Sequence, residues 1–595
     1  MSAMAGGDGL HRPREESIVA REHRIPKASR GSRQAPLVAV ALVALVAALP
    51  SVSPRTAGGQ TFDIIVRNGH LIDGTGTPWV SGDLGIRDGR IAAIGNLAGA
   101  SAARVIDAHG MVVAPGFIDM LGQSELTILV DPHLPSKIYQ GITTEITGEG
   151  NSVAPLNDAI LTADRPIYEH YHLNPDWRTL DQYFTRLENQ GMGINLGTYV
   201  GATQVRRMVL GDDDRAPSPA ELDGMRSLVD QAMQAGALGV STALQYAPAP
   251  YATTNELIAL AKEAARFGGI YATHMRNESD GEMAALDEAI RIGREAGIPV
   301  EIWHLKTAGK RNFGKMPEVI ARINQARSEG VNIGADTYAY TAWFNSLSAF
   351  VPPWAHDGGD ARLLERLQDP ALRARIRKEM EIPSASWDNE WQEIPEPEAV
   401  LVAVVNTPAL LPLQGKRLSE IAAEWHEDPR DAIFDLLIKD HAQTDVAVFG
   451  MSEPDVALAL QQPWVSICND SPGAAPTGLL GTEHPHPRAY GTFPRILRKY
   501  VREEHKLTLE DAIRKFSALP AVRLHLADRG VLKLGMWADV VVFDPDKIRD
   551  VATYDDPNQL SVGMEYVLVN GVLVIDHGQM TNALPGKVIR GRGYQ

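Results

Sequence analysis

Polar side chains with acid–base or metal-binding chemistry recur at the ends of short apolar runs in this sequence. The runs have the length of β-strands, and the residues at or just after their ends are Asp119, Glu149, His274, His304 with Lys306, Asp336 and Asp470. Imidazole and carboxylate groups are common ligands of Zn²⁺, and a catalytic zinc keeps one coordination position for water. Convergence of these groups at one sheet edge therefore predicts a zinc site with a carboxylate base. Alternatively, His274 and His304 only end their strands and hydrogen-bond locally, and spacing alone leaves both interpretations open.

The elements that must position these side chains alternate between strands and helices. Eight strand-like runs end near residues 119, 147, 200, 241, 273, 302, 334 and 467. Residues 218–221 (SPAE) form a capping box with proline at the first helical position, and Thr253 begins another helix that Gly268-Gly269 ends. This alternation predicts an α/β fold, a (β/α)₈ TIM-type barrel over residues 116–525 with reactive groups at the C-terminal ends of its strands.

Two segments do not fit a simple barrel. Residues 446–449 (VAVF) are a ninth strand candidate, and residues 343–440 are too long for one connection. Long insertions on the catalytic face commonly form lids, so we interpret 343–440 as a lid insertion.

Both ends of the chain after residue 60 are rich in short strands. Asp88-Gly89 and Asn570-Gly571 each lie between two strand-like runs. Such pairs favour a two-residue hairpin turn, which needs positive φ at both central residues. We therefore expect one small β-sandwich domain built from residues 61–115 and 526–595.

The first 60 residues have the pattern of a leader. An arginine-containing polar segment precedes 13 uninterrupted apolar residues at 37–49 (LVAVALVALVAAL). A membrane-spanning helix needs about 20 residues, whereas the apolar region of a signal peptide has about 7–15. We predict an exported protein, periplasmic or secreted, that contacts the membrane only if this leader is retained as an anchor.

Composition narrows the class of protein further. The 595 residues include 57 Lys and Arg and 74 Asp and Glu, which gives a net charge of −17. A nucleic-acid-binding protein needs a basic surface, so we expect no nucleic-acid partner. The single cysteine, Cys468, cannot form an intrachain disulfide and reports no redox compartment.

Several longer motifs stand around the candidate site residues. They are 113–119 (VAPGFID), 271–278 (YATHMRNE), 304–306 (HLK), 336–342 (DTYAYTA), 486–488 (HPR) and 491–495 (GTFPR). Together they resemble the amidohydrolase superfamily, and within it the D-aminoacylase (N-acyl-D-amino-acid deacylase) branch. The resemblance runs from about residue 62 to 578.

The resemblance implies a metal-dependent barrel, a two-ended β-sandwich and hydrolysis of an amide. His274 and His304 match metal-binding histidines, and Asp470 matches the aspartate that takes a proton from water and returns it to the leaving amine. Positions that hold the substrate carboxylate are matched by Lys306, Arg488 and a tyrosine of the Tyr338/Tyr340 pair. An arginine fork grips a carboxylate through two bonds, which suits this role. Arg276 is a further candidate, with a salt bridge to Glu278 or Asp280 as the alternative.

The sequence departs from the branch at two metal positions. The His-x-His that follows the first strand is replaced by Leu121-Gly122-Gln123, and a metal-binding Cys is replaced within residues 148–151 (GEGN). Leucine cannot bind a metal and a glutamine amide is a poor zinc ligand, so we expect the second metal position to be vacant. Glu149 is the best substitute for the lost thiolate, which predicts one Zn²⁺ per chain on Glu149, His274 and His304. The alternative for Glu149 is a helix-capping or arginine-paired acid.

These observations predict hydrolysis of small-molecule N-acyl amino acids, with a bias to the D configuration, by water that a mononuclear zinc and Asp470 activate. Another carboxylate-bearing amide, a cyclic amide or a dipeptide is an alternative substrate. A barrel that binds an acylated ligand without turnover is a second alternative, suggested by the lost metal ligands. Retention of His274, His304 and Asp470 together favours an enzyme.

Overall fold

The computed structural model describes residues 61–384, 386–394 and 396–595. The predicted leader, with its apolar run at 37–49, lies outside the described residues. Among the described helices, none combines the length and the apolar character that a bilayer crossing requires.

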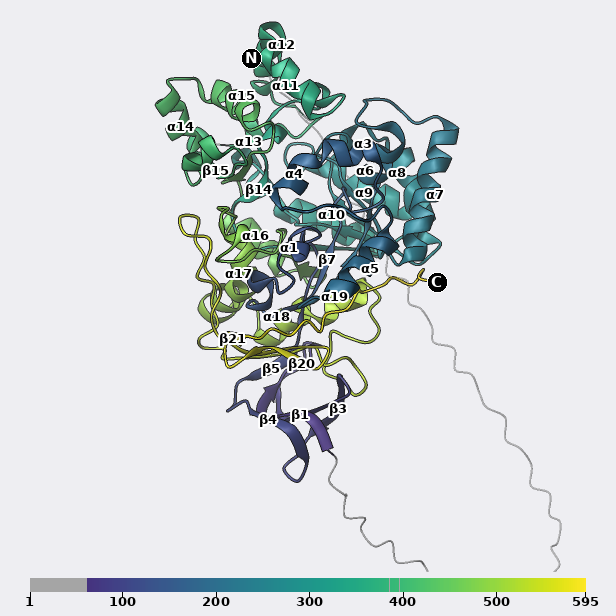
Figure 1. Ribbon diagram of the computed structural model, residues 1–595, viewed down its shortest axis with the longest axis vertical. Helices are drawn as coiled ribbons and strands as arrows, with labels where there is room; N and C mark the ends of the chain where they lie inside the picture. Colours follow the sequence, from purple (N-terminus) through teal and green to yellow (C-terminus); the bar gives the residue numbers. More distant parts are fainter. Residues whose placement is uncertain (1–60, 385, 395) are drawn as a thin grey trace, which may run out of the picture. The chain divides into compact units, whose positions relative to one another are not determined.

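Strands from both ends of the described chain form one nine-stranded sheet, which Figure 1 shows as purple and yellow strands side by side. Its order is β21-β20-β19-β18-β5-β1-β2-β3, and β4 pairs with β1. The strands are β1 (Thr61–Leu71), β2 (Val80–Arg87), β3 (Arg90–Gly95), β4 (Ser101–Asp107), β5 (Val112–Pro115), β18 (Val540–Phe543), β19 (Met564–Val569), β20 (Val572–Asp576) and β21 (Gln579–Met580). The two chain ends join where β5 pairs antiparallel with β18.

Both predicted hairpins are confirmed. Asp88 and Gly89 connect β2 and β3 with φ values of 53° and 72°, and Asn570 and Gly571 connect β19 and β20 with 49° and 80°. Asparagine, aspartate and glycine tolerate this left-handed backbone better than other residues, which is why the pairs are a strong turn signal.

Two parallel sheets carry the middle of the chain, which confirms the predicted α/β class. One has the order β6-β7-β8 and the other β17-β13-β12-β11-β10-β9. The strands are β6 (Phe117–Asp119), β7 (Ile142–Thr147), β8 (Asn195–Thr198), β9 (Val200–Gly201), β10 (Gly239–Ala243), β11 (Ile270–His274), β12 (Val300–Ile302), β13 (Ile333–Thr337) and β17 (Val465–Ile467). Hydrogen bonds link the sheets at both margins: Leu238 N donates to Thr198 O at 2.9 Å, and Asp470 N to Leu121 O at 2.8 Å.

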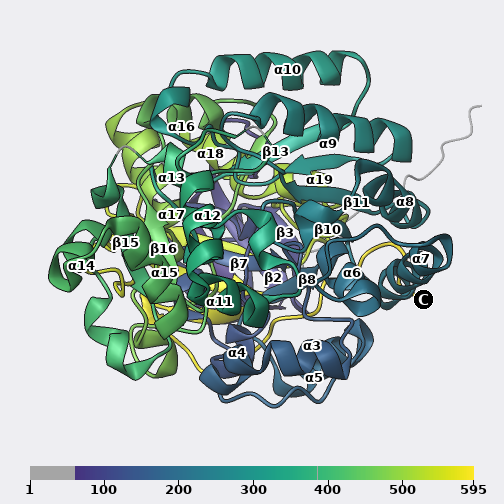
Figure 2. The same ribbon diagram turned by 90° about the horizontal axis from the view of Figure 1, so that it is seen from above.

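Helices alternate with these strands, and Figure 2 shows α6 to α10 outside them. The capping box is confirmed at α7, where Ser218 N donates to Glu221 Oε2 at 2.7 Å and Pro219 is the first helical residue. The helices are α1 (Thr127–Val130), α2 (Pro135–Ile138), α3 (Asp158–Ala163), α4 (Arg165–His170), α5 (Leu180–Gln190), α6 (Ala202–Leu210), α7 (Pro219–Ala235), α8 (Thr254–Ala265), α9 (Glu282–Ala296), α10 (Met316–Ser328), α16 (Glu453–Leu460), α17 (Arg488–Arg495), α18 (Leu509–Phe516) and α19 (Ala518–Arg523).

The long segment after β13 forms a small substructure of its own. Its antiparallel sheet has the order β14-β16-β15, built from β14 (Trp343–Ser346), β15 (Val400–Val404) and β16 (Asp445–Val448). The ninth strand candidate is thus β16, outside the parallel sheets. The helices of this segment are α11 (Asp360–Gln368), α12 (Pro370–Met380), α13 (Glu390–Glu393), α14 (Leu418–Trp425) and α15 (Pro429–Lys439).

The last residues of the chain run beside the parallel strands. Leu196 of β8 donates its backbone N–H to Lys587 O at 3.0 Å and accepts at its carbonyl from Ile589 N at 2.8 Å. Farther along, Gly591 N donates to Gly236 O at 2.8 Å. The C-terminal segment therefore belongs both to the nine-stranded sheet and to the margin of the α/β part.

Candidate active site

A cavity of about 240 Å³ lies where the parallel strands end. Five of the predicted site residues line it: Glu149, His274, His304, Lys306 and Asp470. The opposite part of the lining comes from the segment after β13, including Asn345, Asp388, Glu390 and Glu393. The strand ends and the segment after β13 thus build one site together.

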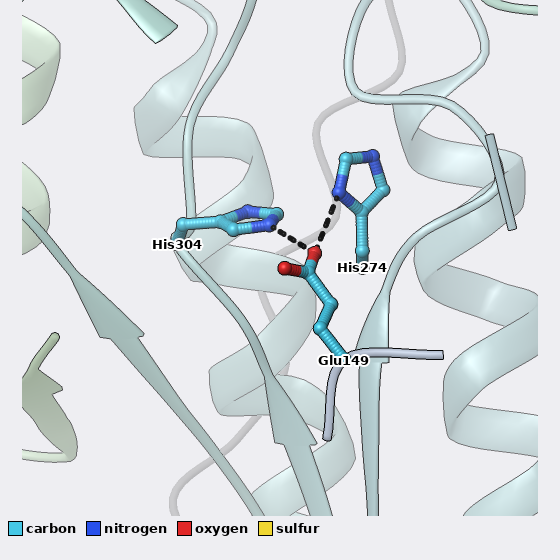
Figure 3. A group of neighbouring side chains, drawn as sticks. All are labelled: Glu149, His274 and His304. Atoms are coloured by element: carbon cyan, nitrogen blue, oxygen red, sulfur yellow. Dashed lines mark hydrogen bonds and ion pairs between the residues drawn. The ribbon is translucent and has the colours of Figure 1, made fainter. Parts of the chain in front are cut away.

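Glu149, His274 and His304 point toward one another (Figure 3). Glu149 Oε1 lies 3.3 Å from His274 Nδ1 and 3.4 Å from His304 Nε2. Donor atoms placed about 2.0–2.1 Å from one tetrahedral zinc ion are separated by about 3.3–3.4 Å. The three residues therefore fit a divalent metal ion, and in the described part of the chain they are the only group of three such residues.

Two glycines fix the position of Glu149. Gly148 and Gly150 flank it with φ values of +95° and +64°, a backbone conformation that L side chains rarely adopt. A Cβ at Gly148 would meet Tyr199 O at 2.7 Å, and one at Gly150 would meet Ala243 N at the same distance. Only glycine at both places lets the loop after β7 approach the neighbouring strands and aim Glu149 at the histidines.

The electrostatics of the cluster favour positive charge. Burial alone would raise the pKa of Glu149, but hydrogen bonds from His274 and His304 and their positive charge hold it well below its usual range. For His304, burial and Lys306 lower the pKa, yet Glu278, Asp470 and Glu149 outweigh them and raise it to about 10. These carboxylates stabilise a cation at this point, and a metal ion supplies that charge.

Two residues that the sequence analysis missed hold the outer nitrogens of the histidines. His274 Nε2 donates to Gln245 Oε1 at 2.8 Å, and His304 Nδ1 lies 3.1 Å from Glu278 Oε1. Such partners fix the ring orientation and leave the other nitrogen to face a metal. Glu278 stands in the 271–278 motif four residues after His274, so its place in the motif could have indicated a role at the site. No sequence feature indicated Gln245.

Asp470 lies on the same cavity and is held by two neighbours. Arg488 Nη1 is 2.7 Å from Asp470 Oδ2, and Gln123 Nε2 donates to Asp470 Oδ1 at 3.3 Å. The same Gln123 nitrogen donates to Glu149 Oε2 at 2.7 Å. Gln123, from the segment that replaces His-x-His, therefore ties the predicted base to the predicted ligand.

The predicted carboxylate-binding residues occupy different surroundings. Lys306 lines the cavity and pairs with Glu278 Oε2 at 2.5 Å. Arg488 is 1% exposed and stacks over Tyr338, with its guanidinium carbon 4.7 Å from the ring centre. Tyr340 donates its hydroxyl to Pro487 O at 3.3 Å. The cavity lining does not include Arg488, Tyr338 or Tyr340, so these contacts favour support of Asp470 and its surroundings.

Arg276 has a structural set of partners. Its Nε and Nη2 donate to Glu288 at 2.9 and 3.0 Å, and its other bonds go to the carbonyls of Pro250 and Ala252. The predicted alternative, a salt bridge to Glu278 or Asp280, was wrong about the partner, because α9 presents Glu288 to the guanidinium. The binding of a substrate by Arg276 stays a prediction that these contacts do not support.

Three other polar residues near the strand ends serve the framework. Asp336 accepts a hydrogen bond from His304 N at 2.6 Å, which holds the backbone of a residue with φ of +36°. Asp119 pairs with the buried Lys137 at 2.9 Å. Cys468 is buried, and burial raises the pKa of its thiol well above the usual range, which disfavours a thiolate nucleophile.

The model of the amidohydrolase family matches residues 104–575. N-acyl-D-glutamate deacylase of Alcaligenes xylosoxydans xylosoxydans is 35% identical over 542 residues, which cover 89% of this chain and 97% of the relative. D-aminoacylase of the same organism is 36% identical over 531 residues, with 89% and 98% covered.

Solved structures of the same kinds of protein are similar to this chain. The crystal structure of N-acyl-D-glutamate deacylase from Bordetella bronchiseptica, complexed with zinc and a phosphonate inhibitor, has a TM-score of 0.76 and 34% identity, and the match covers 89% of this chain and 100% of that one. A D-aminoacylase structure, studied for one-metal activation and second-metal attenuation of its binuclear centre, has a TM-score of 0.74 and 34% identity, with 89% and 99% covered.

Proposed function

The chain belongs to the amidohydrolase family, and on this basis we propose that it is a metal-dependent hydrolase that cleaves the amide bond of N-acyl-D-amino acids. The observation that carries the proposal is the cavity in which Glu149, His274 and His304 stand opposite Asp470. A non-catalytic binding protein has no need of a carboxylate base beside a metal site.

We propose one Zn²⁺ per chain on Glu149, His274 and His304. Their donor separations suit a tetrahedral ion, and a related N-acyl-D-glutamate deacylase was crystallised with zinc. When bound, such an ion polarises a carbonyl oxygen and lowers the pKa of water. Gln245 and Glu278 orient the two imidazoles for this task.

Asp470 is the proposed base and acid. Burial raises the pKa of Asp470, which makes its carboxylate a better proton acceptor, while Arg488 and Gln123 hold it in position. The carboxylate accepts a proton from the water that attacks the amide carbonyl carbon. It then gives this proton to the nitrogen as the C–N bond breaks, so that an acid and a free amino acid leave.

Lys306 is the proposed partner of the substrate carboxylate, because it is the cation that lines the cavity. To bind the substrate it exchanges its bond with Glu278 for one with the ligand. Arg488 would have to leave Asp470 to do the same, so we assign it to positioning of the base. Tyr338 supports Arg488 through its ring face.

We also propose that the two parallel sheets form one (β/α)₈ barrel over residues 116–525, with 343–440 as a lid and a β-sandwich domain from 61–115 and 526–595. The hydrogen bonds from Leu238 to Thr198 and from Asp470 to Leu121, which link the sheets at both margins, support the barrel. Export through the leader at 1–60 is proposed from the apolar run at 37–49.

The test combines metal analysis with a deacylation assay. We expect about one zinc per chain, loss of turnover with a chelator, and faster release from N-acetyl-D- than from N-acetyl-L-amino acids. Asp470→Asn should lower kcat by about 10²–10⁴-fold while metal content is unchanged. Asp555→Asn, an exposed control, should keep the full rate. No metal with no turnover would contradict the proposed function, and an unchanged rate in Asp470→Asn would remove Asp470 as the base.

A further inference from the structure

Three buried carboxylic acids on the inserted segment face the same cavity as the metal cluster. Asp388, Glu390 and Glu393, here called the acidic wall, are 4%, 0% and 2% exposed and all line the cavity. They do not belong to the catalytic machinery proposed above.

The acidic wall has no cation of its own. Within the described residues, no Lys, Arg or His nitrogen lies in ion-pair distance of the three carboxyl groups, although buried charges are normally paired. Glu390 accepts from neutral donors only, namely Gln245 Nε2 at 2.8 Å, Trp343 Nε1 at 3.4 Å and Asn345 Nδ2. Asp388 accepts from Glu278 N at 3.0 Å and from the Ser279 hydroxyl.

Acceptor atoms in this part of the lining also lack partners. Glu393 Oε1 and Asn345 Oδ1 are buried and accept no hydrogen bond. An unsatisfied buried acceptor is destabilising and is expected where a ligand or ion completes it. Asn345 Oδ1 can only accept, and Glu393 Oε1 can only accept when its carboxyl group is ionised, so a group that completes both atoms is a hydrogen-bond donor.

The charge of the whole cavity points the same way. The two cations near the reaction centre are already committed, Lys306 to Glu278 or to the α-carboxylate of the substrate, and Arg488 to Asp470. Burial raises the pKa of Glu390 to about 8, and burial with the neighbouring Asp388 carboxyl raises the pKa of Glu393 well above its usual range, so a nearby cation would favour the ionised form of both. A further anion here would be repelled, whereas a cation would be stabilised.

We infer that the acidic wall binds a positively charged group of the substrate, so that this chain prefers cationic substrates over the anionic side chains of D-glutamate and D-aspartate. The inference rests on the proposed function, because it concerns the substrate of that same site. The shared chemistry is a guanidinium or ammonium group that donates to Asp388, Glu390 and Glu393. It comes either from the side chain of the amino acid or from the ammonium of an aminoacyl group.

Matched substrate pairs test both sources on the zinc-loaded enzyme. For the side chain, N-acetyl-D-arginine should exceed its neutral isostere N-acetyl-D-citrulline in kcat/KM by about 10–100-fold, as charged hydrogen bonds do. For the acyl group, glycyl-D-leucine should exceed N-acetyl-D-leucine by a similar factor. N-acetyl-D-glutamate should be slower than N-acetyl-D-glutamine in either case.

A substitution in the acidic wall tests whether the wall causes the preference for cationic substrates. Glu393→Gln keeps the shape and removes one carboxylate, so the ratio of kcat/KM between the preferred cationic substrate and its neutral partner should fall about tenfold. Glu396→Gln, an exposed control on the same segment, should keep the wild-type ratio.

The outcomes separate this inference from the proposed function. If N-acetyl-D-citrulline and N-acetyl-D-leucine are turned over at rates equal to or above those of N-acetyl-D-arginine and glycyl-D-leucine, the proposed function stands, and the acidic wall is overturned as a cation site. No turnover of any N-acyl-D-amino acid would overturn the function and the inference with it. If Glu393→Gln fails to fold, the wild-type ratios still decide.

Discussion

Two clusters of buried acids in this protein have opposite designs. At the start of the α/β part, Asp119 and Glu145 lie 2.9 and 3.3 Å from Lys137 Nζ, and all three side chains are fully buried. The acidic wall of Asp388, Glu390 and Glu393 is equally buried, but its neighbours are neutral donors and each other. A cluster that holds its own cation is complete without a ligand. A cluster that lacks a cation and faces a cavity is complete only when a ligand supplies the cation.

The cation of the first cluster is expected to carry the largest effect. Lys137→Met leaves two carboxylates buried without a counter-charge, and breaking a buried ion pair in this way costs about 3–5 kcal/mol of unfolding free energy. Urea unfolding measures it. Lys547→Met, which removes an exposed lysine paired with Asp544, is the control and should leave the urea midpoint nearly unchanged. A small loss for Lys137→Met would mean that this cluster does not need its cation.

Gln245 connects the second cluster to the metal site, because it accepts from His274 and donates to Glu390. Gln245→Leu removes both bonds and should weaken zinc affinity by about 10–100-fold, the usual effect of losing such a partner. Competition with a chelator measures the affinity without relying on turnover. Gln231→Leu on the exposed face of α7 is the matched control. Unchanged affinity would show that the wall and the metal ligands are independent.

The lack of a cation at the acidic wall should also make the stability of the protein depend on pH, with a smaller effect than the two substitutions above. The pKa of Glu390 is raised by burial from its usual 4.5 to about 8. Between these values Glu390 keeps a proton in the folded protein that it has released in the unfolded chain, so its contribution to stability is fully present below about pH 4.5 and is lost as the pH rises to about 8. We expect Tm to drop by about 2–4 °C across this window at constant metal content.

Glu390→Gln isolates this contribution, since Glu125 and Asp445 also have a pKa raised to about 7 by burial. The slope of Tm against pH should be shallower in this variant than in the wild type. Identical slopes would show that Glu390 is ionised without cost and would weaken the contrast between the two clusters.

The sequence could predict most of the metal ligands and the base of the site. His274, His304 and Asp470 were predicted from strand ends, because parallel strands bring their carboxyl ends to one edge whatever the loops do. Glu149 followed from a position where its relatives carry a different ligand. Gln123 was considered a poor zinc ligand, and the structure places it between Glu149 and Asp470.

The acidic wall had no comparable signal. Asp388, Glu390 and Glu393 lie in or just before the short helix α13, and Glu390 contacts β14 through Asn345. Periodicity reports the buried face of a regular element, and α13 is only four residues long. The same holds for Arg488, which by motif faces a substrate and in the structure contacts Asp470.

The nine-stranded sheet has a consequence for the order of folding during synthesis. β5 pairs with β18, and β8 pairs with the backbone at residues 587–589, so both strands find these partners only after the intervening α/β part has been synthesised. Until then β5 and β8 each keep one open edge, and open strand edges invite pairing with other chains. A nascent chain that stops before residue 540 lacks β18 to β21 and leaves the edge of β5 uncovered.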